Sequence, residues 1–299
     1  MSRPERLQVE LRAAVAEDTP DVLEFTSKIW EGDDYVPFVW LDWLADPRGR
    51  LLVAVHENKV VGLGKLSQLS GEDWWLEGLR VNPEYEGRGI ASQIHTALFD
   101  IWAEIGAGCI RLATASYRLP IHHLCDRLGF SKVAECSFFR APVLFEDKSF
   151  SLSSFTLLNM DMIDIALDFS QQSPMIKLGY GLMDLGWQYA PPREEYFAMT
   201  VMKQRAFWWQ HDRGLLFFSE DEEENLRTPF IQLIAGDPSN LAAMLLDYRR
   251  LAGAMSYPEA AWAAPVNPQV LAILNISGFR RTWKDSLYIY SRSKSNFES

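Results

Sequence analysis

The sequence contains few cysteines and no long apolar run. Cys109, Cys125 and Cys136 are the three cysteines in 299 residues, and their spacing fits neither a metal site nor a disulfide framework. Such usage is typical of reduced thiols in the cytosol. No apolar stretch approaches the roughly 20 residues that a membrane helix needs, and the N-terminus lacks the apolar segment of a signal peptide. We therefore expect a cytoplasmic protein that binds neither a membrane nor a metal.

Basic clusters are absent as well. Asp and Glu number 40 against 29 Lys and Arg, which gives a formal net charge of −11. Nucleic acid is not expected as a partner, because neutralising its phosphates requires clustered Lys and Arg. With 48% hydrophobic and 23% charged residues, the composition is that of an ordinary globular protein. We expect a small-molecule partner and a monomer or homodimer.

Several catalytic motifs are missing, but one glycine-rich segment is informative. The chain has no His-Glu-x-x-His zinc motif and no Gly-x-x-x-x-Gly-Lys-Ser/Thr loop. Residues 76–91, LEGLRVNPEYEGRGIA, predict a strand, a turn, a glycine-spaced loop and then a helix. Backbone N–H groups at such a helix start, together with the helix dipole, can cradle a pyrophosphate. Gly87 and Gly89 would let the backbone approach the ligand, and Arg88 would add a charged contact.

This order of strand, Val-x-Pro, aromatic residue and Gly-Arg-Gly-Ile-Ala resembles motif A of the GNAT acyltransferases, whose loop holds the pyrophosphate of acetyl-CoA. The resemblance implies acetyl-CoA as cosubstrate and an α/β (α+β) GNAT fold, a mixed central sheet flanked by helices. We expect strands at 8–14, 51–56, 59–69, 73–81, 109–115 and 130–140, and helices at 20–30, 35–44, 91–106 and 119–128. The residues implied to bind acetyl-CoA are Leu79, Arg80, Val81, Glu86, Gly87, Arg88, Gly89, Ile90 and Ala91.

The second half of the chain contains a degenerate echo of the first. A predicted strand at 230–235 and helix at 239–252 are joined by Gly-Asp-Pro-Ser-Asn, which lacks the paired glycines and the arginine. Asp237 in this connector would repel a pyrophosphate. We expect a catalytic GNAT domain at 1–145 and a degenerate GNAT-like domain, packed against it, at 146–299; the alternative is a chance match of common α/β patterns. The acidic run 220–224 is predicted to be a solvated loop.

Three further segments resemble a narrower family, the histidine N-acetyltransferase-like (N-acetyltransferase 16-like) proteins. They are Asp34-Tyr35-Val36-Pro37, then Trp43-Leu44 with Asp46-Pro47, and Glu77-Gly78-Leu79-Arg80-Val81. The resemblance implies acetyl transfer to the α-amino group of an amino acid. It does not fix which one, because residues 116–118 show no clear match.

Transfer to an amine requires a deprotonated amine and a proton donor for the leaving thiolate. Glu77, beside two tryptophans, is the candidate general base; the alternatives are that it binds the acceptor ammonium or pairs with Arg80 or Arg111. Many GNAT enzymes have a tyrosine five residues before the Phe of a Gly-Phe pair, and this chain has Cys125 there. Cys125 and Tyr117 are therefore the candidate proton donors.

The acceptor is expected to lie against Asp34, Tyr35, Trp74 and Trp75. The leading interpretation is an acetyl-CoA-dependent N-acetyltransferase that acts on the primary amine of a small molecule, such as a free amino acid. Two alternatives stay open: a non-catalytic acyl-CoA-binding sensor, for which the missing tyrosine argues, and a protein N-acetyltransferase.

Overall fold

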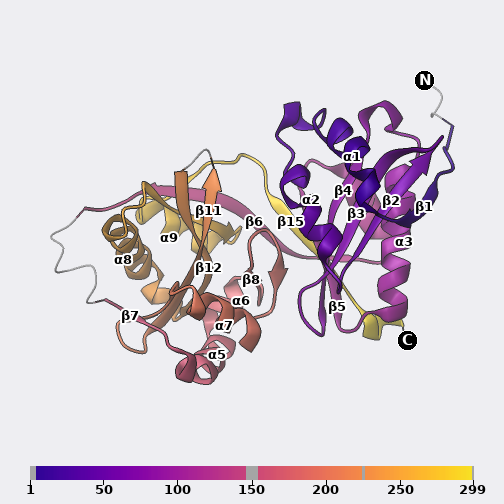
Figure 1. Ribbon diagram of the computed structural model, residues 1–299. Helices are drawn as coiled ribbons and strands as arrows, with labels where there is room; N and C mark the ends of the chain where they lie inside the picture. The colour runs from indigo at the N-terminus through magenta and orange to yellow at the C-terminus, as the bar shows by residue number, and fades with distance from the viewer. Residues whose placement is uncertain (1–4, 146–153, 224–225, 298–299) are drawn as a thin grey trace. The chain divides into compact units, whose positions relative to one another are not determined.

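The computed structural model describes residues 5–145, 154–223 and 226–297, and its chain divides into two compact units (Figure 1). Unit 1 comprises Met1–Leu112, Leu119–Ser131 and Tyr290–Ser299, and unit 2 comprises Ala113–Arg118 and Lys132–Ile289. The units are thus not two consecutive stretches of chain. The domain boundary predicted at residue 145 stays a prediction.

Unit 1 is built on a mixed sheet with helices on both faces (Figure 1). The strands lie in the order β1-β2-β3-β4-β5, with β1 to β4 antiparallel and β5 parallel to β4. The strands are β1 (Glu10–Ala13), β2 (Arg50–His56), β3 (Lys59–Gln68), β4 (Asp73–Val81) and β5 (Cys109–Ala115), and the helices are α1 (Thr19–Thr26), α2 (Val36–Ala45), α3 (Ile90–Ile105) and α4 (Leu119–Arg127).

Alternation along β3 places helices on opposite faces of this sheet. Leu63 belongs to a buried cluster that includes residues of α1 and α2. Its neighbours Gly62 and Gly64 point the other way, against Ile94 of α3. Because successive strand residues face opposite sides, β3 is covered on both faces, and it is buried over almost its whole length.

The β2–β3 hairpin follows from its two turn residues. Glu57 and Asn58 both have positive φ, 50° and 62°, as a two-residue turn of the primed type requires. The predicted strands and helices of unit 1 are confirmed, with one change: the helix expected at 20–30 ends at Thr26, and a separate 3-10 turn, Trp30–Gly32, follows. Glu31 in that turn has a φ of 60°, which an α-helix cannot accommodate.

Unit 2 repeats the same succession of elements. Three antiparallel strands, β10, β11 and β12, are followed by α8, by β13 parallel to β12, and by α9. Phe217 of β11 packs against Phe197 of α7, and Phe218 packs against Tyr248 of α8, so helices cover both faces here too (Figure 1). The strands are β6 (Ser131–Pro142), β7 (Phe155–Leu157), β8 (Met183–Asp184), β9 (Tyr189–Ala190), β10 (Ala206–Trp209), β11 (Gly214–Glu223), β12 (Leu226–Gly236), β13 (Glu259–Pro265), β14 (Arg280–Arg281) and β15 (Leu287–Ser293), and the helices are α5 (Ile163–Gln172), α6 (Pro174–Leu178), α7 (Glu194–Met202), α8 (Leu241–Ala254) and α9 (Pro268–Ile276).

The last residues of the chain complete unit 1. The backbone N–H of Lys294 donates to the carbonyl of Gly108 at 2.9 Å, and the Arg292 guanidinium lies 4.8 Å from the ring centroid of Phe99. Nδ1 of His122 and the Tyr290 hydroxyl are 2.6 Å apart. These contacts hold the C-terminal segment against α3 and α4, which begin about 200 and 170 residues earlier in the chain.

The acidic run 220–224 is predicted to be a solvated loop; Asp221 and Glu222 are exposed as expected, but the loop is wrong for the described part of the run. Residues 220–223 continue β11, and Glu222 lies opposite Arg227 of β12. Glu220 is half-buried and forms an ion pair with Arg205 and a hydrogen bond with the Tyr257 hydroxyl. The positive charges of Arg205 and Arg227 offset the repulsion among the acidic side chains. The run can therefore form a strand. Residue 224 lies outside the described residues.

A buried ion pair at the start of β4 provides a test of this fold. Asp73 and Arg111 of β5 are 2.7 Å apart and are 1% and 8% exposed. Substituting Asp73→Ala would leave a buried guanidinium without its carboxylate, so we expect a loss of about 3–5 kcal/mol in the free energy of unfolding. The matched variant Glu24→Ala, which removes an exposed partner of Lys28, should cost less than about 1 kcal/mol. Urea denaturation measures both; equal losses would contradict the expectation.

Candidate active site

The centre of the candidate site is a bulge in β4. Leu63 lies opposite Arg80 and Lys65 opposite Glu77, so β4 carries one residue more than β3 between these pairs. Gly78 takes up the difference with a φ of 63°, a conformation that glycine adopts without strain. A side chain at Gly78 would begin 2.4 Å from Cη2 of Trp43. The indole of α2 therefore covers the bulge directly.

Glu77 precedes this bulge with a half-buried side chain. Its carboxylate accepts a short hydrogen bond from the Ser67 hydroxyl on β3. Tyr35 lies close by. Its hydroxyl forms a hydrogen bond with the backbone of Gly78, and the charges of Arg80 and Glu77 affect its pKa. Tyr35 as a whole is 40% exposed, but desolvation of its hydroxyl raises its pKa to about 12, so the phenol stays protonated at neutral pH.

Arg80 and Asp34 form a buried ion pair beneath this group. Nε and Nη2 of Arg80 donate to the two carboxylate oxygens of Asp34 at 2.9 and 2.8 Å, and the side chains are 8% and 1% exposed. The guanidinium also lies 4.4 Å from the ring centroid of Trp30 and 5.1 Å from that of Tyr35. Both carboxylate oxygens of Asp34 therefore bind Arg80. That Asp34 also binds the acceptor amine stays a prediction.

The predicted phosphate loop has the backbone that the glycine spacing requires. α3 begins at Ile90, and Gly87 and Gly89 before it have φ of 75° and 80°. Asn82 caps the preceding 3-10 turn by accepting from the backbone N–H of Glu84 at 3.1 Å, which fixes the approach to the loop. The start of a 16-residue helix behind two left-handed glycines fits a pyrophosphate group.

Residues near the N-terminus lie against this loop. The N–H of Leu7 donates to the carbonyl of Arg88 at 3.0 Å, and Nε2 of Gln93 donates to the carbonyl of Leu7 at 2.8 Å. The Arg6 side chain passes 3.4 Å from where a Cβ on Gly89 would lie. Both Arg6 and Arg88 are thus cationic neighbours of the loop; the sequence pattern identified only Arg88.

Trp74 and Trp75 are core residues in unit 1. Their exposed fractions are 4% and 3%. Trp75 lies opposite Arg111 in the parallel ladder that joins β4 to β5 over Asp73–Trp75. This burial favours packing as their main role, and an acceptor wall formed by their rings stays a prediction.

The two predicted proton donors differ in their surroundings. Cys125 of α4 is fully buried, and burial raises the pKa of its thiol to about 12. Tyr117, which belongs to unit 2, is 60% exposed, and its ring packs edge-on against Trp283 at 6.5 Å. Accessibility therefore favours Tyr117 over Cys125.

Unit 1 thus combines a mixed sheet, helices on both of its faces and a glycine loop at the start of α3. Residues 16–130 match the model of the acetyltransferase (GNAT) family, so this segment of the chain is similar to that family. Members of the family use acetyl-CoA to acetylate an acceptor.

A histidine N-acetyltransferase of Scomber australasicus is 35% identical over 92 residues, which make up 29% of this chain and 27% of that protein. The chain spans about a quarter of the length of the curated relatives it matches. A GCN5-related N-acetyltransferase of Sphaerobacter thermophilus superposes with a TM-score of 0.63 at 10% identity and 96% coverage of each chain. A tandem GNAT protein from the clavulanic acid biosynthesis pathway gives 0.60 at 11% identity, covering 96% of this chain and 99% of that one. These similarities confirm the mixed α/β GNAT fold.

Over residues 5–145, 154–223 and 226–297, no helix is long and apolar enough to cross a membrane. In the same described part of the chain, no three His, Cys, Asp or Glu side chains are grouped as metal ligands.

The glycine in the bulge can be tested by itself. Gly78→Ala would force a methyl group against the Trp43 ring and strain a φ of 63°, so we expect a destabilisation of about 1–3 kcal/mol. Gly71→Ala is the control, because a Cβ there meets nothing within 4 Å. Thermal unfolding of both variants gives the comparison; a Gly78→Ala protein as stable as wild type would mean that the bulge and Trp43 do not constrain each other.

Proposed function

We propose that the protein is an acetyl-CoA-dependent N-acetyltransferase for the primary amine of a small molecule, such as a free amino acid. The observation that carries the proposal is the loop of Gly87 and Gly89 at the start of α3, within the segment that matches the GNAT family. Its backbone supports pyrophosphate binding in the way that the family uses it.

The residues proposed to hold acetyl-CoA follow the chain from β4 into α3. Backbone groups of Leu79, Arg80 and Val81 would pair with the pantetheine arm as an added strand does. Backbone N–H groups between Glu86 and Ala91 would bind the pyrophosphate, with Arg88 and Arg6 neutralising its charge. When bound, acetyl-CoA supplies an activated acetyl thioester.

Glu77 is proposed to take the proton from the acceptor amine. A protonated amine is not a nucleophile, so the acceptor must lose a proton before it attacks the thioester. The Glu77 carboxylate is half-buried and oriented by the Ser67 hydroxyl. Binding the acceptor ammonium without removing its proton is the alternative role.

The leaving thiolate requires a proton donor. A thiol with a pKa of about 12, as in Cys125, would protonate a thiolate of ordinary pKa, about 8.5, only uphill. Tyr117, which is 60% exposed, stays the other predicted donor. Tyr35, whose pKa is also raised to about 12, would face the same uphill transfer as Cys125.

Histidine is the first acceptor to test, because the relative from Scomber australasicus is named a histidine N-acetyltransferase. The experiment is CoA release by purified full-length protein with acetyl-CoA and each of the twenty amino acids and the common polyamines, followed by thiol detection. A selective signal would establish the activity and its acceptor. Calorimetric binding of acetyl-CoA with no release from any amine would instead support a sensor.

The loop variant Gly89→Glu accompanies that experiment. It adds negative charge to the proposed phosphate site at a position with a φ of 80°, and we expect it to abolish acetyl-CoA binding and CoA release together. Gly71→Glu, in the exposed turn before β4, should bind like wild type. Retained binding by Gly89→Glu would place the cosubstrate elsewhere.

The base is tested by Glu77→Gln, which keeps the shape and the hydrogen bond from Ser67. Loss of the proton acceptor should lower kcat by about a hundredfold to ten-thousandfold, with acetyl-CoA affinity unchanged. If Glu77 only binds the ammonium, KM for the amine rises and kcat is kept. An unchanged kcat/KM would remove Glu77 from the site.

A further inference from the structure

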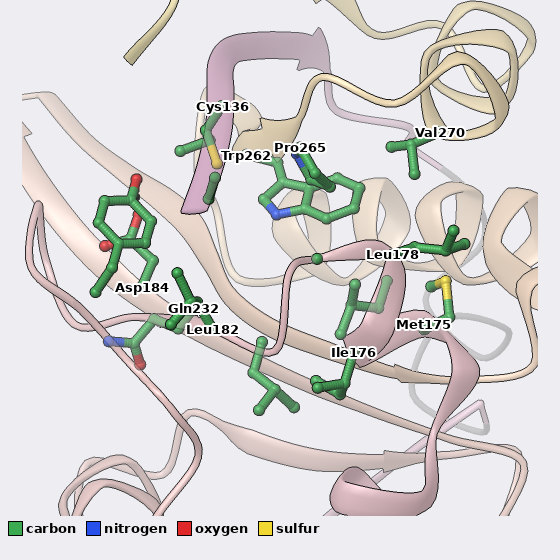
Figure 2. A pocket seen from close by; sticks show the side chains of 16 residues that line it. Cys136, Met175, Ile176, Leu178, Leu182, Asp184, Gln232, Trp262, Pro265 and Val270 are labelled. Carbon is green, nitrogen blue, oxygen red and sulfur yellow. Dashed lines mark hydrogen bonds between the residues drawn. The ribbon is translucent and has the colours of Figure 1, made fainter. Parts of the chain in front are cut away.

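Unit 2 contains a cavity of its own, at the point where two parallel strands separate. β12 and β13 pair at Phe230↔Ala261 and Ile231↔Trp262, and the residues after these, from Gln232 on one strand and Ala263 on the other, line the cavity. About 560 Å³ of space lies between the lining residues when the opening to solvent is counted. All sixteen lining residues belong to unit 2 (Figure 2).

The loop beside this cavity is closed to a phosphate. Gly236 ends β12 where Gly87 and Gly89 follow β4 in unit 1. Its backbone N–H donates to the Ser173 hydroxyl at 2.7 Å, and that hydroxyl donates to its carbonyl at 3.0 Å. Asp237 accepts from the N–H of Ser239 at 2.8 Å. Because side chains already use these groups, the site suits a ligand without phosphates.

The opposite ends of the cavity differ in polarity. Figure 2 shows Met175, Leu178 and Val270 at one end, Trp262 in the middle, and Asp184 with Gln232 at the other end. The long wall between the ends is apolar, and burial of an apolar ligand body against it is favourable. A ligand that fits this wall has a short aliphatic or aromatic body.

Asp184 supplies the charge at the polar end. One carboxylate oxygen accepts from the N–H groups of Gly186 and Trp187 at 2.9 and 3.0 Å, and the other accepts from the Tyr189 hydroxyl at 3.2 Å. A carboxylate has about four accepting positions, so it can take one more donor. Burial raises the pKa of Asp184 to about 6, which leaves the group mostly ionised at neutral pH.

Nothing cationic lines the cavity to balance this charge. None of the sixteen lining residues is Lys, Arg or His. A half-buried carboxylate among apolar groups is stabilised by an ammonium donor more than by a neutral one. We propose that the cavity of unit 2 binds a small molecule with an apolar body and a primary ammonium group, the body against Trp262 and Leu178 and the ammonium at Asp184. This site is independent of the proposed acetyl transfer.

Calorimetry on the full-length protein without acetyl-CoA tests the proposal, with phenethylamine and isoamylamine as probes. We expect one phenethylamine per chain at this cavity. Phenethyl alcohol has nearly the same shape but no charge, and it should bind at least about tenfold more weakly. A charged group strengthens a hydrogen bond by enough free energy to change the affinity by about that much. Equal binding of the alcohol would overturn the proposal.

Variants locate the binding. Asp184→Asn keeps an oxygen for its backbone donors and should weaken phenethylamine about tenfold, whereas Asp237→Asn, which removes an exposed charge in the same unit, should not. Leu178→Trp, at a partly buried position beside the core, fills the apolar end and should remove binding in protein that thermal unfolding shows to be folded. Glu77→Gln must leave phenethylamine binding unchanged. Binding that survives in Asp184→Asn and Leu178→Trp, or that is lost in Glu77→Gln, would assign it to another site and refute the proposal.

Discussion

The ion pair between Arg80 and Asp34 is the constraint around which the candidate site of unit 1 is arranged. Two charged side chains that are 8% and 1% exposed carry a large desolvation cost, which a bidentate geometry offsets only when both partners are present. This pair joins the connection between α1 and α2 to the strand that carries Glu77. Trp30 and Tyr35 cover the guanidinium, and Tyr35 packs edge-on against Trp43 at 6.0 Å. The position of the whole aromatic group above the β4 bulge thus depends on one salt bridge.

The segments that could be predicted from sequence are those whose signal is local. The helix expected at 91–106 is observed as Ile90–Ile105, because a glycine pair before an amphipathic run specifies both its start and its face. The hairpin was predictable for the same reason, since Glu57-Asn58 is a turn between two apolar strands. The phosphate loop needed no information from the rest of the chain, and its glycines have the positive φ that their spacing indicates.

The remaining features of the site depend on contacts between distant residues. Arg80 pairs with Asp34, which lies 46 residues away in the sequence. Glu77 accepts a hydrogen bond from Ser67 on the neighbouring strand. No periodic sequence pattern predicts either contact. The acidic run at 220–223 has no apolar alternation, so its strand was missed, and only Arg205 and the opposite Arg227 explain it. The return of residues 290–299 to unit 1 is likewise invisible in local patterns. Sequence therefore predicted the conformation of the glycine loop better than the contacts of Glu77 and Arg80.

The two units show how one succession of elements can carry loops of different charge. In unit 1 the residues before the crossover helix are Gly-Arg-Gly, and the loop keeps left-handed glycines beside Arg6 and Arg88. In unit 2 the equivalent loop carries Asp237, and Ser173 uses both backbone groups of Gly236. A pyrophosphate would meet positive potential in the first loop and an acidic side chain in the second. The charge also reverses at the cavity, where Asp184 stands without a lining cation. Because the strands and helices are shared, this difference in ligand chemistry arises from a few loop and helix-start residues, while the sheet only determines where those residues lie.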